Sequence, residues 1–428
     1  MRGGISIGRI WGVPLYADGG ALLLLGLFSW FSGYSYASVS PNLGLVFGLL
    51  TGIVLLFSIL LHELAHTYVA QSFGIKVKQV ALSLTGGFTE MDQEYKTPWS
   101  AFAVSVIGPL VSIAFGFGMF VLANELGLGN VIGQFTPEIR RNPELIRGLL
   151  EKLGNWRVLS ALMCWEIACL NIIWGIFNLL PFFPLDGEQA LRAILWKLSG
   201  DRFRSGIWSA RVGQFSGNLL IGLGLFLLLG GGGLDSLWLM LVGWLISSTA
   251  GAKLQLSSIQ QALLSVSCEM AMTRDFRIVD GEITIREFVD RYLLLEEKSP
   301  VFVANVNGRD RGIVQVEKVR SIDPSFWHQM KVLEIVKPIG ELATADLNQN
   351  LAWAINTLES NQLRSLTVLS PVGSIAGVID RGDILMALAR KLKWVVPESF
   401  VKQIKEEGRF PADFRIAEIS AQLLNSNE

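Results

Sequence analysis

Long runs of apolar residues dominate the first 250 positions of the chain. A helix of about 20 residues crosses the hydrocarbon of a bilayer. Three runs approach or exceed that length and hold at most one charge, at residues 43–61, 101–123 and 159–180. Three weaker runs are shorter or richer in glycine and serine, at residues 19–37, 212–229 and 237–250. The pattern predicts about six transmembrane helices, and the glycines at 230–233 make the last two a helical hairpin.

After about residue 255 the pattern changes to charged segments that alternate between strand and helix. Residues 299–319 and 364–385 both read as strand, glycine turn, strand and helix, and a helical pattern precedes each. This is an internal repeat with a period of about 60 to 70 residues. We therefore predict a membrane domain at 1–253, a soluble α/β module of two halves at 254–392, and a charged tail at 393–428.

Composition agrees with this division. The chain is 51% hydrophobic and 17% charged, with a mean hydropathy of +0.44, well away from the soluble average. The net charge of −1 conceals an asymmetry, because charges are sparse before about Ala250 and frequent after it. Cys164, Cys169 and Cys268 are too few for a disulfide framework. No segment has the pattern of a cleaved signal peptide.

Lysine and arginine positions give an orientation. With the N-terminus inside, most of these charges fall in the inner segments, and the first and third outer loops hold none. The second outer loop, residues 124–158, holds five of them and opposes this orientation. We expect both termini to be cytoplasmic, in a prokaryotic inner membrane or its organelle equivalent.

The sequence LLHELAHT, residues 60–67, ends the second apolar run and holds two of the three histidines of the chain. Four residues make about one helical turn, so His62 and His66 project from the same face and can bind one metal ion. Glu63 lies beside them, where it can take a proton from water. Zinc suits imidazole ligands, and a catalytic zinc site keeps one position open for water, whose pKa falls to about 7.

The simpler alternative is a pair of packing histidines at a helix end. It would leave two imidazoles and a carboxylate desolvated without partners, at a cost of several kcal/mol. The motif therefore predicts a metal site.

Two histidines leave this site one ligand short. His328 falls in the soluble part, and Glu90 lies 24 residues after His66. The segment NLLPFFPLDG, residues 178–187, is the better source, because prolines that end a membrane helix free backbone groups where they line a wet cavity. Asp186 in this segment could reach the metal, although an aspartate before a glycine is also typical of a turn.

Residues 80–91 follow the histidine motif and alternate between apolar and polar side chains around Gly86 and Gly87. This pattern predicts a β-hairpin. An ordinary surface hairpin is one interpretation. Its position after the motif also makes it a candidate edge for docking an extended peptide, with Gly86 and Gly87 as substrate-binding residues.

The order of HExxH and Asn-x-x-Pro-x-x-Pro-Leu-Asp-Gly, each at the end of a membrane helix, resembles the site-2 protease family of intramembrane metalloproteases. The opening IGRIWGVPLY and Gly108-Pro109-Leu110 are also similar to that family. The resemblance covers about residues 1–250.

This resemblance implies a role for each motif residue. His62, His66 and Asp186 would hold one Zn²⁺ ion, with Glu63 as the general base. Asn178 and Pro181 would help to hold the substrate strand. Glu166, within the fourth predicted helix, and Asn171 are better suited to hydrogen bonds between helices than to catalysis.

The repeat after residue 255 is similar to a tandem pair of CBS domains, which some site-2 proteases carry. That family often binds adenine nucleotides through a Gly-h-x-Thr-x-x-Asp segment. Residues 377–383 keep Asp383 but have Asp380 in place of the threonine, and residues 312–318 lack both. Nucleotide binding at Asp383 is therefore weakly supported, and dimerisation or gating is at least as good an expectation.

Together these features predict a polytopic α-helical membrane protein with a β-hairpin and a soluble CBS-domain pair. We expect an intramembrane zinc endopeptidase that cleaves single-span membrane proteins, as in regulated intramembrane proteolysis, modulated by the CBS-like pair. The same pair could form a homodimer, and we expect no nucleic-acid partner. The alternative is a CBS-gated transporter or channel, which would leave the placement of Glu63 and Asp186 unexplained.

Overall fold

The computed structural model describes residues 4–37, 41–84, 86–92, 95–128, 144, 155–182, 184–294, 301–411 and 414–425. The chain divides into two compact units, Met1–Gln255 and Leu256–Glu428. Helix α9 (Leu234–Ser265) contains the division point. Most of the second predicted outer loop lies outside the described residues, and the three domain limits given above remain predictions.

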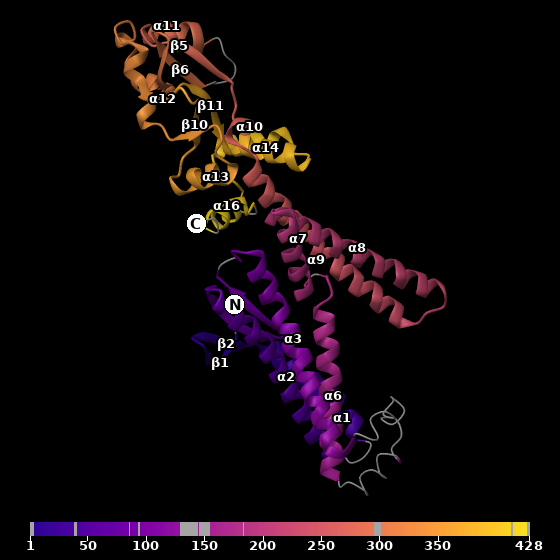
Figure 1. Ribbon diagram of the computed structural model, residues 1–428. Helices are drawn as coiled ribbons and strands as arrows, with labels where there is room; N and C mark the ends of the chain where they lie inside the picture. Colours follow the sequence, from indigo (N-terminus) through magenta and orange to yellow (C-terminus); the bar gives the residue numbers. More distant parts are fainter. Residues whose placement is uncertain are drawn as a thin grey trace. The chain divides into compact units, whose positions relative to one another are not determined.

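All six apolar runs of the first unit form helices. They are α1 (Gly19–Ala37), α2 (Pro41–Ser72), α3 (Pro98–Ala123), α6 (Asn155–Asn178), α8 (Arg202–Leu229) and α9, with a short π-helical turn at Asn124–Leu128 and the amphipathic α7 (Asp186–Ser199) between α6 and α8 (Figure 1). Within the described residues, five are long and apolar enough to cross a membrane, and α1 is a shorter apolar helix. The chain is a polytopic membrane protein, and the total of six spans remains a prediction.

Polar residues define where several of these helices begin. Asp18 Oδ1 accepts a hydrogen bond from the backbone N–H of Gly20 at 2.8 Å, which caps α1. Thr97 caps α3 and is followed by Pro98, a residue suited to the first helical turn. Asp201 caps α8. Helices α8 and α9 are longer than the apolar runs at 212–229 and 237–250. Each helix continues into neighbouring residues outside its apolar run.

Glycine and polar contacts join the membrane helices. A side chain at Gly48 of α2 would collide with the backbone of Ser29 in α1, so these two helices approach closely. Ser32 in α1 donates a hydrogen bond to Glu166 of α6 at 3.0 Å, which is the interhelical contact expected of Glu166. Asn171 instead donates to Ile167 O of its own helix.

A four-stranded sheet covers one side of α2. Its strands are β1 (Ile5–Ile10), β2 (Val13–Ala17), β3 (Val77–Ser83) and β4 (Gly86–Met91), in the order β1-β2-β3-β4. The β3–β4 hairpin was predicted, whereas β1 and β2 were not. Val13, Leu15 and Val80 pack against Leu64, so the sheet lies directly over the histidine motif. Strand β4 is at the edge of the sheet.

The second unit repeats one strand–helix order twice. In the first half, β5 (Phe276–Asp280) is followed by α11 (Ile285–Phe288), a π-helical turn (Val289–Leu293) and β6 (Val301–Val306), which pairs in parallel with β5. Strand β7 (Arg309–Val314), which is antiparallel to β6, and α12 (Val316–Ser321) complete this half. In the second half, β9 (Thr344–Asp346), α13 (Leu351–Ser360), β10 (Ser365–Leu369), β11 (Ile375–Asp380) and α14 (Arg381–Leu392) follow the same order. The predicted repeat is confirmed.

Shorter elements complete this unit: α10 (Cys268–Ala271), β8 (Val336–Pro338) and 3₁₀ turns at Pro324–Phe326, Val332–Ile335 and Ile339–Glu341. The turn between β6 and β7 uses Asn307 and Gly308, which both have positive φ, as a tight hairpin of this type requires. After α14, helices α15 (Glu398–Glu407) and α16 (Ile416–Asn425) contact α14 and α13 respectively. Ile404 and Leu423 are buried there, so much of the charged tail is folded against the second half.

Candidate metal centre

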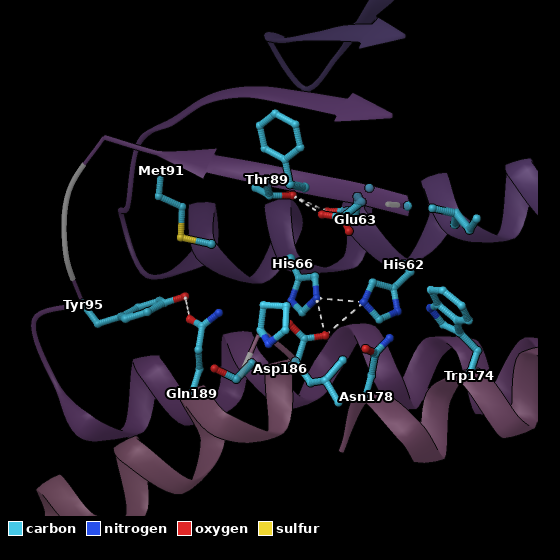
Figure 2. A pocket seen from close by; sticks show the side chains of 17 residues that line it. His62, Glu63, His66, Thr89, Met91, Tyr95, Trp174, Asn178, Asp186 and Gln189 are labelled. Carbon is cyan, nitrogen blue, oxygen red and sulfur yellow. Dashed lines mark hydrogen bonds and ion pairs between the residues drawn. The ribbon is translucent and has the colours of Figure 1, made fainter. Parts of the chain in front are cut away.

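Three side chains from two distant parts of the chain converge beside α3 (Figure 2). His62 and His66 come from α2, and Asp186 is the first residue of α7. His62 Nε2 lies 3.1 Å from His66 Nε2 and 3.1 Å from Asp186 Oδ2, and His66 Nε2 lies 3.3 Å from the same carboxylate oxygen. Among the described residues, this is the one group of three or more His, Cys, Asp or Glu side chains close enough to hold a metal ion.

The outer nitrogens of both rings are held by α3. His66 Nδ1 lies 2.6 Å from the backbone oxygen of Val104, and His62 Nδ1 lies 2.9 Å from Ser112 Oγ. A carbonyl oxygen can only accept, so His66 Nδ1 carries the proton and Nε2 presents a lone pair to the centre. This is the arrangement in which histidine binds a metal.

The spacing of the three donor atoms fits zinc. A tetrahedral zinc ion with bonds of about 2.0–2.2 Å places its ligand atoms roughly 3.3–3.5 Å apart. The observed separations of 3.1 and 3.3 Å are within a few tenths of an ångström of that range. Two imidazoles and one carboxylate are also a common ligand set of catalytic zinc, which leaves the fourth position for water.

The chain reaches Asp186 through a sharp reversal after α6. Helix α6 ends at Asn178, prolines at 181 and 184 follow, and α7 begins at Asp186. A side chain at Gly187 would collide with the backbone oxygens of Leu179 and Leu180, so only glycine permits this close turn. Oδ2 of Asp186 then faces Nε2 of both His62 and His66. Glu90, the other sequence candidate, instead accepts a hydrogen bond from Gln79.

Glu63 projects into the space beside the three donors and is held by β4. Thr89 Oγ1 donates a hydrogen bond to Glu63 Oε2 at 2.8 Å, and Glu63 is only 7% exposed. A side chain at Gly87 would collide with the Glu63 side chain. The hairpin therefore sets the position of this carboxylate as well as covering it.

These residues line a cavity of about 420 Å³. Gly86, Gly87 and Asn178 also line this cavity, whereas Pro181 is not among the described residues that line it. At one end of the cavity, the Tyr95 hydroxyl lies 3.4 Å from Gln189 Oε1. Burial, together with the charge of Asp186, raises the pKa of Tyr95 to about 12, so this hydroxyl stays protonated. Trp174 lies at the other end (Figure 2). The cavity is therefore polar at the end away from Trp174.

Sequence patterns alone do not predict several of these contacts. Thr89 was within the predicted hairpin, but nothing in the pattern connects it with Glu63. Ser112 and Val104 were part of an apolar run. Tyr95 and Gln189 carried no signal beyond being close in sequence to the hairpin and to Asp186.

Asp383, the candidate nucleotide-binding residue, lies at the start of α14 in the second unit. It forms a reciprocal cap with Asp380, whose side chain accepts from the Asp383 N–H at 2.8 Å. Lys405 of α15 lies 2.6 Å from Asp383 and 3.2 Å from Asp380. Both carboxylates are thus already paired with a cation of the chain itself.

Known proteins are similar to this chain over most of its length. The family model for peptidase family M50 matches residues 50–220. A protein of Mycobacterium tuberculosis named as a candidate zinc metalloprotease, Rip3, is 32% identical over 392 residues, which cover 90% of this chain and 92% of the relative. Another candidate zinc metalloprotease, sll0528 of Synechocystis sp., is 29% identical over 91% of this chain and 96% of the relative.

Two solved structures are similar to parts of this chain. The site-2 protease from Methanocaldococcus jannaschii has a TM-score of 0.37 and 25% identity, over 59% of this chain and 95% of that chain. A CBS domain of a bacterial CNNM/CorC family Mg²⁺ transporter, solved with ATP, has a TM-score of 0.26 and 15% identity, over 32% of this chain and 97% of that chain.

Proposed function

The chain belongs to peptidase family M50, and we propose that His62, His66 and Asp186 hold its zinc ion and that Glu63 is its general base. The protein is an intramembrane zinc metalloprotease with a C-terminal CBS-domain pair, and its family does not favour the transporter alternative. The residue roles are supported by one observation above all. Three donor atoms from α2 and α7 converge at a spacing that fits zinc, with a buried carboxylate beside them.

Zinc, when bound here, supplies Lewis acidity, which acidifies water and polarises the scissile carbonyl. Glu63 takes the proton that the attacking water loses, and later delivers it to the leaving amine. Thr89 donates to Oε2 of Glu63, which leaves Oε1 as the oxygen that takes this proton. Ser112 and the Val104 carbonyl keep both imidazoles turned toward the centre.

The substrate is a membrane protein, and we propose that its scissile segment binds as an extended strand along β4. Strand β4 is at the edge of the sheet and lines the cavity with Gly86, Gly87 and Thr89. A free edge can accept main-chain hydrogen bonds from an added strand. Asn178, on the opposite wall, offers an amide to the same segment. An unwound segment is needed because a peptide bond within a helix is hydrogen-bonded internally.

The finer features of this proposal follow from the sequence. We place both termini in the cytoplasm on the basis of the lysine and arginine distribution. We also propose single-span proteins as substrates, since one isolated helix can enter the cavity and unwind more readily than a packed one. A homodimer through the CBS-like pair and modulation of cleavage by it belong to the same proposal.

The test is the Glu63→Gln variant, reconstituted in liposomes with a tagged single-span membrane protein. We expect no cleavage above background, with zinc content and assembly unchanged, because glutamine cannot accept the proton. The matched control is Glu125→Gln, which changes an exposed glutamate beyond the far end of α3 and should cleave at the wild-type rate. Cleavage by Glu63→Gln at the control rate would refute the assigned role.

A further inference from the structure

A second cavity, of about 120 Å³, lies among the membrane helices next to the metal centre. Its apolar lining comes from α1, α2 and α6 and consists of Phe28, Leu55, Ile59, Leu170 and Trp174. Ile59 and Trp174 also line the larger cavity that holds the metal donors. The two cavities therefore meet at these two side chains, at the apolar end of the larger one.

The position of this cavity relative to the metal is set by α2. Ser58, which lines it, precedes His62 by four residues, or about one helical turn. The charge-free run 43–61 is on this side of His62. The second cavity is therefore displaced from the metal centre toward the membrane interior. A substrate strand along β4 would place the residue on the membrane side of its scissile bond at this opening.

The polar side chains in the second cavity already have partners. Ser58 Oγ donates to Leu55 O at 2.8 Å, Ser112 Oγ contacts His62 Nδ1, and the Asn171 amide donates to Ile167 O at 2.9 Å. What remains for an occupant is mostly carbon surface, which suits an apolar group. A cavity of about 150 Å³ holds a benzene molecule, so 120 Å³ suits a somewhat smaller group, such as the side chain of leucine.

We propose that this cavity is a specificity subsite that binds a medium-sized apolar side chain of the substrate, on the membrane side of the scissile bond. The inference rests on the proposed function and adds to it a rule for the substrate. A leucine-sized residue gains contacts in the cavity that alanine lacks. Tryptophan is too large to enter without displacing Ile59 or Trp174. One or a few methylene groups in such a subsite change kcat/KM by about tenfold or more.

The experiment uses the full-length enzyme in liposomes and a single-span reporter whose alanine–leucine transmembrane segment is interrupted by an Asn-Gly pair. Mass spectrometry locates the cut. Three versions of the reporter then carry alanine, leucine or tryptophan on the membrane side of that bond. The variant Leu55→Ala enlarges the cavity, and Leu170→Phe fills it from a position that is 40% exposed and so tolerates a larger side chain. Leu49→Ala on the exposed face of α2 is the control.

We expect the wild type to cleave the leucine reporter about tenfold faster than the other two. Leu55→Ala should raise the cleavage rate of the tryptophan reporter relative to that of the leucine reporter. Leu170→Phe should raise the rate of the alanine reporter relative to that of the leucine reporter. The control Leu49→Ala should leave these rate ratios unchanged. If both cavity variants change all three reporters by the same factor, the cavity does not read a side chain and the inference is wrong, while the proposed function stands. If the wild type cleaves no reporter, both fail.

Discussion

Ser112 Oγ lies 2.9 Å from Nδ1 of His62, although the two residues are on different helices and 50 positions apart in the chain. When Nε2 of His62 binds the metal ion, Nδ1 carries the ring proton and donates a hydrogen bond to this serine. The serine hydroxyl accepts this hydrogen bond and so holds the direction of the ring. Partners of this kind typically contribute 10–100-fold to metal affinity or activity.

We predict that Ser112→Ala lowers the zinc affinity of the protein about tenfold or more. The measurement is zinc retained by purified protein in a series of chelator concentrations. Ser216→Ala is a matched control, because Ser216 also lies in a membrane helix but donates only to Val212 O of its own helix. Equal zinc retention by the two variants would show that His62 does not need this partner.

Thr89 gives a second prediction, at the general base. Thr89→Val keeps the shape of the side chain and removes the donor to Glu63 Oε2, so the carboxylate is free to turn away from the water. Misplacing a reacting group by about 1 Å can cost on the order of a hundredfold in rate. We expect kcat to fall about tenfold or more with zinc content unchanged, and Thr89→Ser to retain most of the rate. A serine variant as slow as valine would contradict a role for the hydroxyl.

Gly108 in α3 gives a third prediction, because it faces the metal donors directly. A Cβ atom at this position would collide with Nε2 of both His62 and His66, in the space where those nitrogens face Asp186. Gly108→Ala should therefore displace the imidazoles and abolish both zinc binding and cleavage. Gly118→Ala is the control on the same helix, because a Cβ there meets nothing within 4 Å. Full zinc occupancy in Gly108→Ala would mean that the centre lies elsewhere.

Local patterns were enough to predict part of this site. The four-residue spacing of His62 and His66 on a helix brings their rings to one face whatever the rest of the fold does. The long apolar runs likewise predicted the membrane helices, since length and hydrophobicity decide insertion. The pattern around Asp186 suits a simple turn as well as a metal ligand. The prediction of a metal ligand at Asp186 therefore depended on the family resemblance.

Contacts between distant segments could not be predicted in this way. Thr89 meets Glu63, and Ser112 meets His62, only because the hairpin and α3 pack on particular faces of α2. No periodicity encodes such a pairing. Strands β1 and β2 were missed for a related reason. Trp11 and Gly12 form their turn with positive φ, and β2 is completed by parallel pairing with β3, some 60 residues away.

The charged tail provides the fourth prediction, through Lys405. This residue lies 2.6 Å from Asp383 and 3.2 Å from Asp380, and so joins α15 to the start of α14. These ion pairs of Lys405 are partly exposed, and ion pairs of this kind contribute at most about 1 kcal/mol to the free energy of unfolding. Lys405→Ala should therefore loosen α15 without unfolding the unit, whose second half also buries Ile404.

Hydrogen exchange of the full-length protein measures this loosening directly. A loss of about 1 kcal/mol corresponds to roughly fivefold faster exchange of amides that open with α15. Lys402→Ala on the same helix is the control, because Lys402 is exposed and its partner Glu406 lies 3.8 Å away on α15 itself. The faster exchange should be confined to Lys405→Ala and to residues 398–407. Identical exchange in the two variants would mean that the hydrophobic contacts of Ile404 alone hold the tail in place.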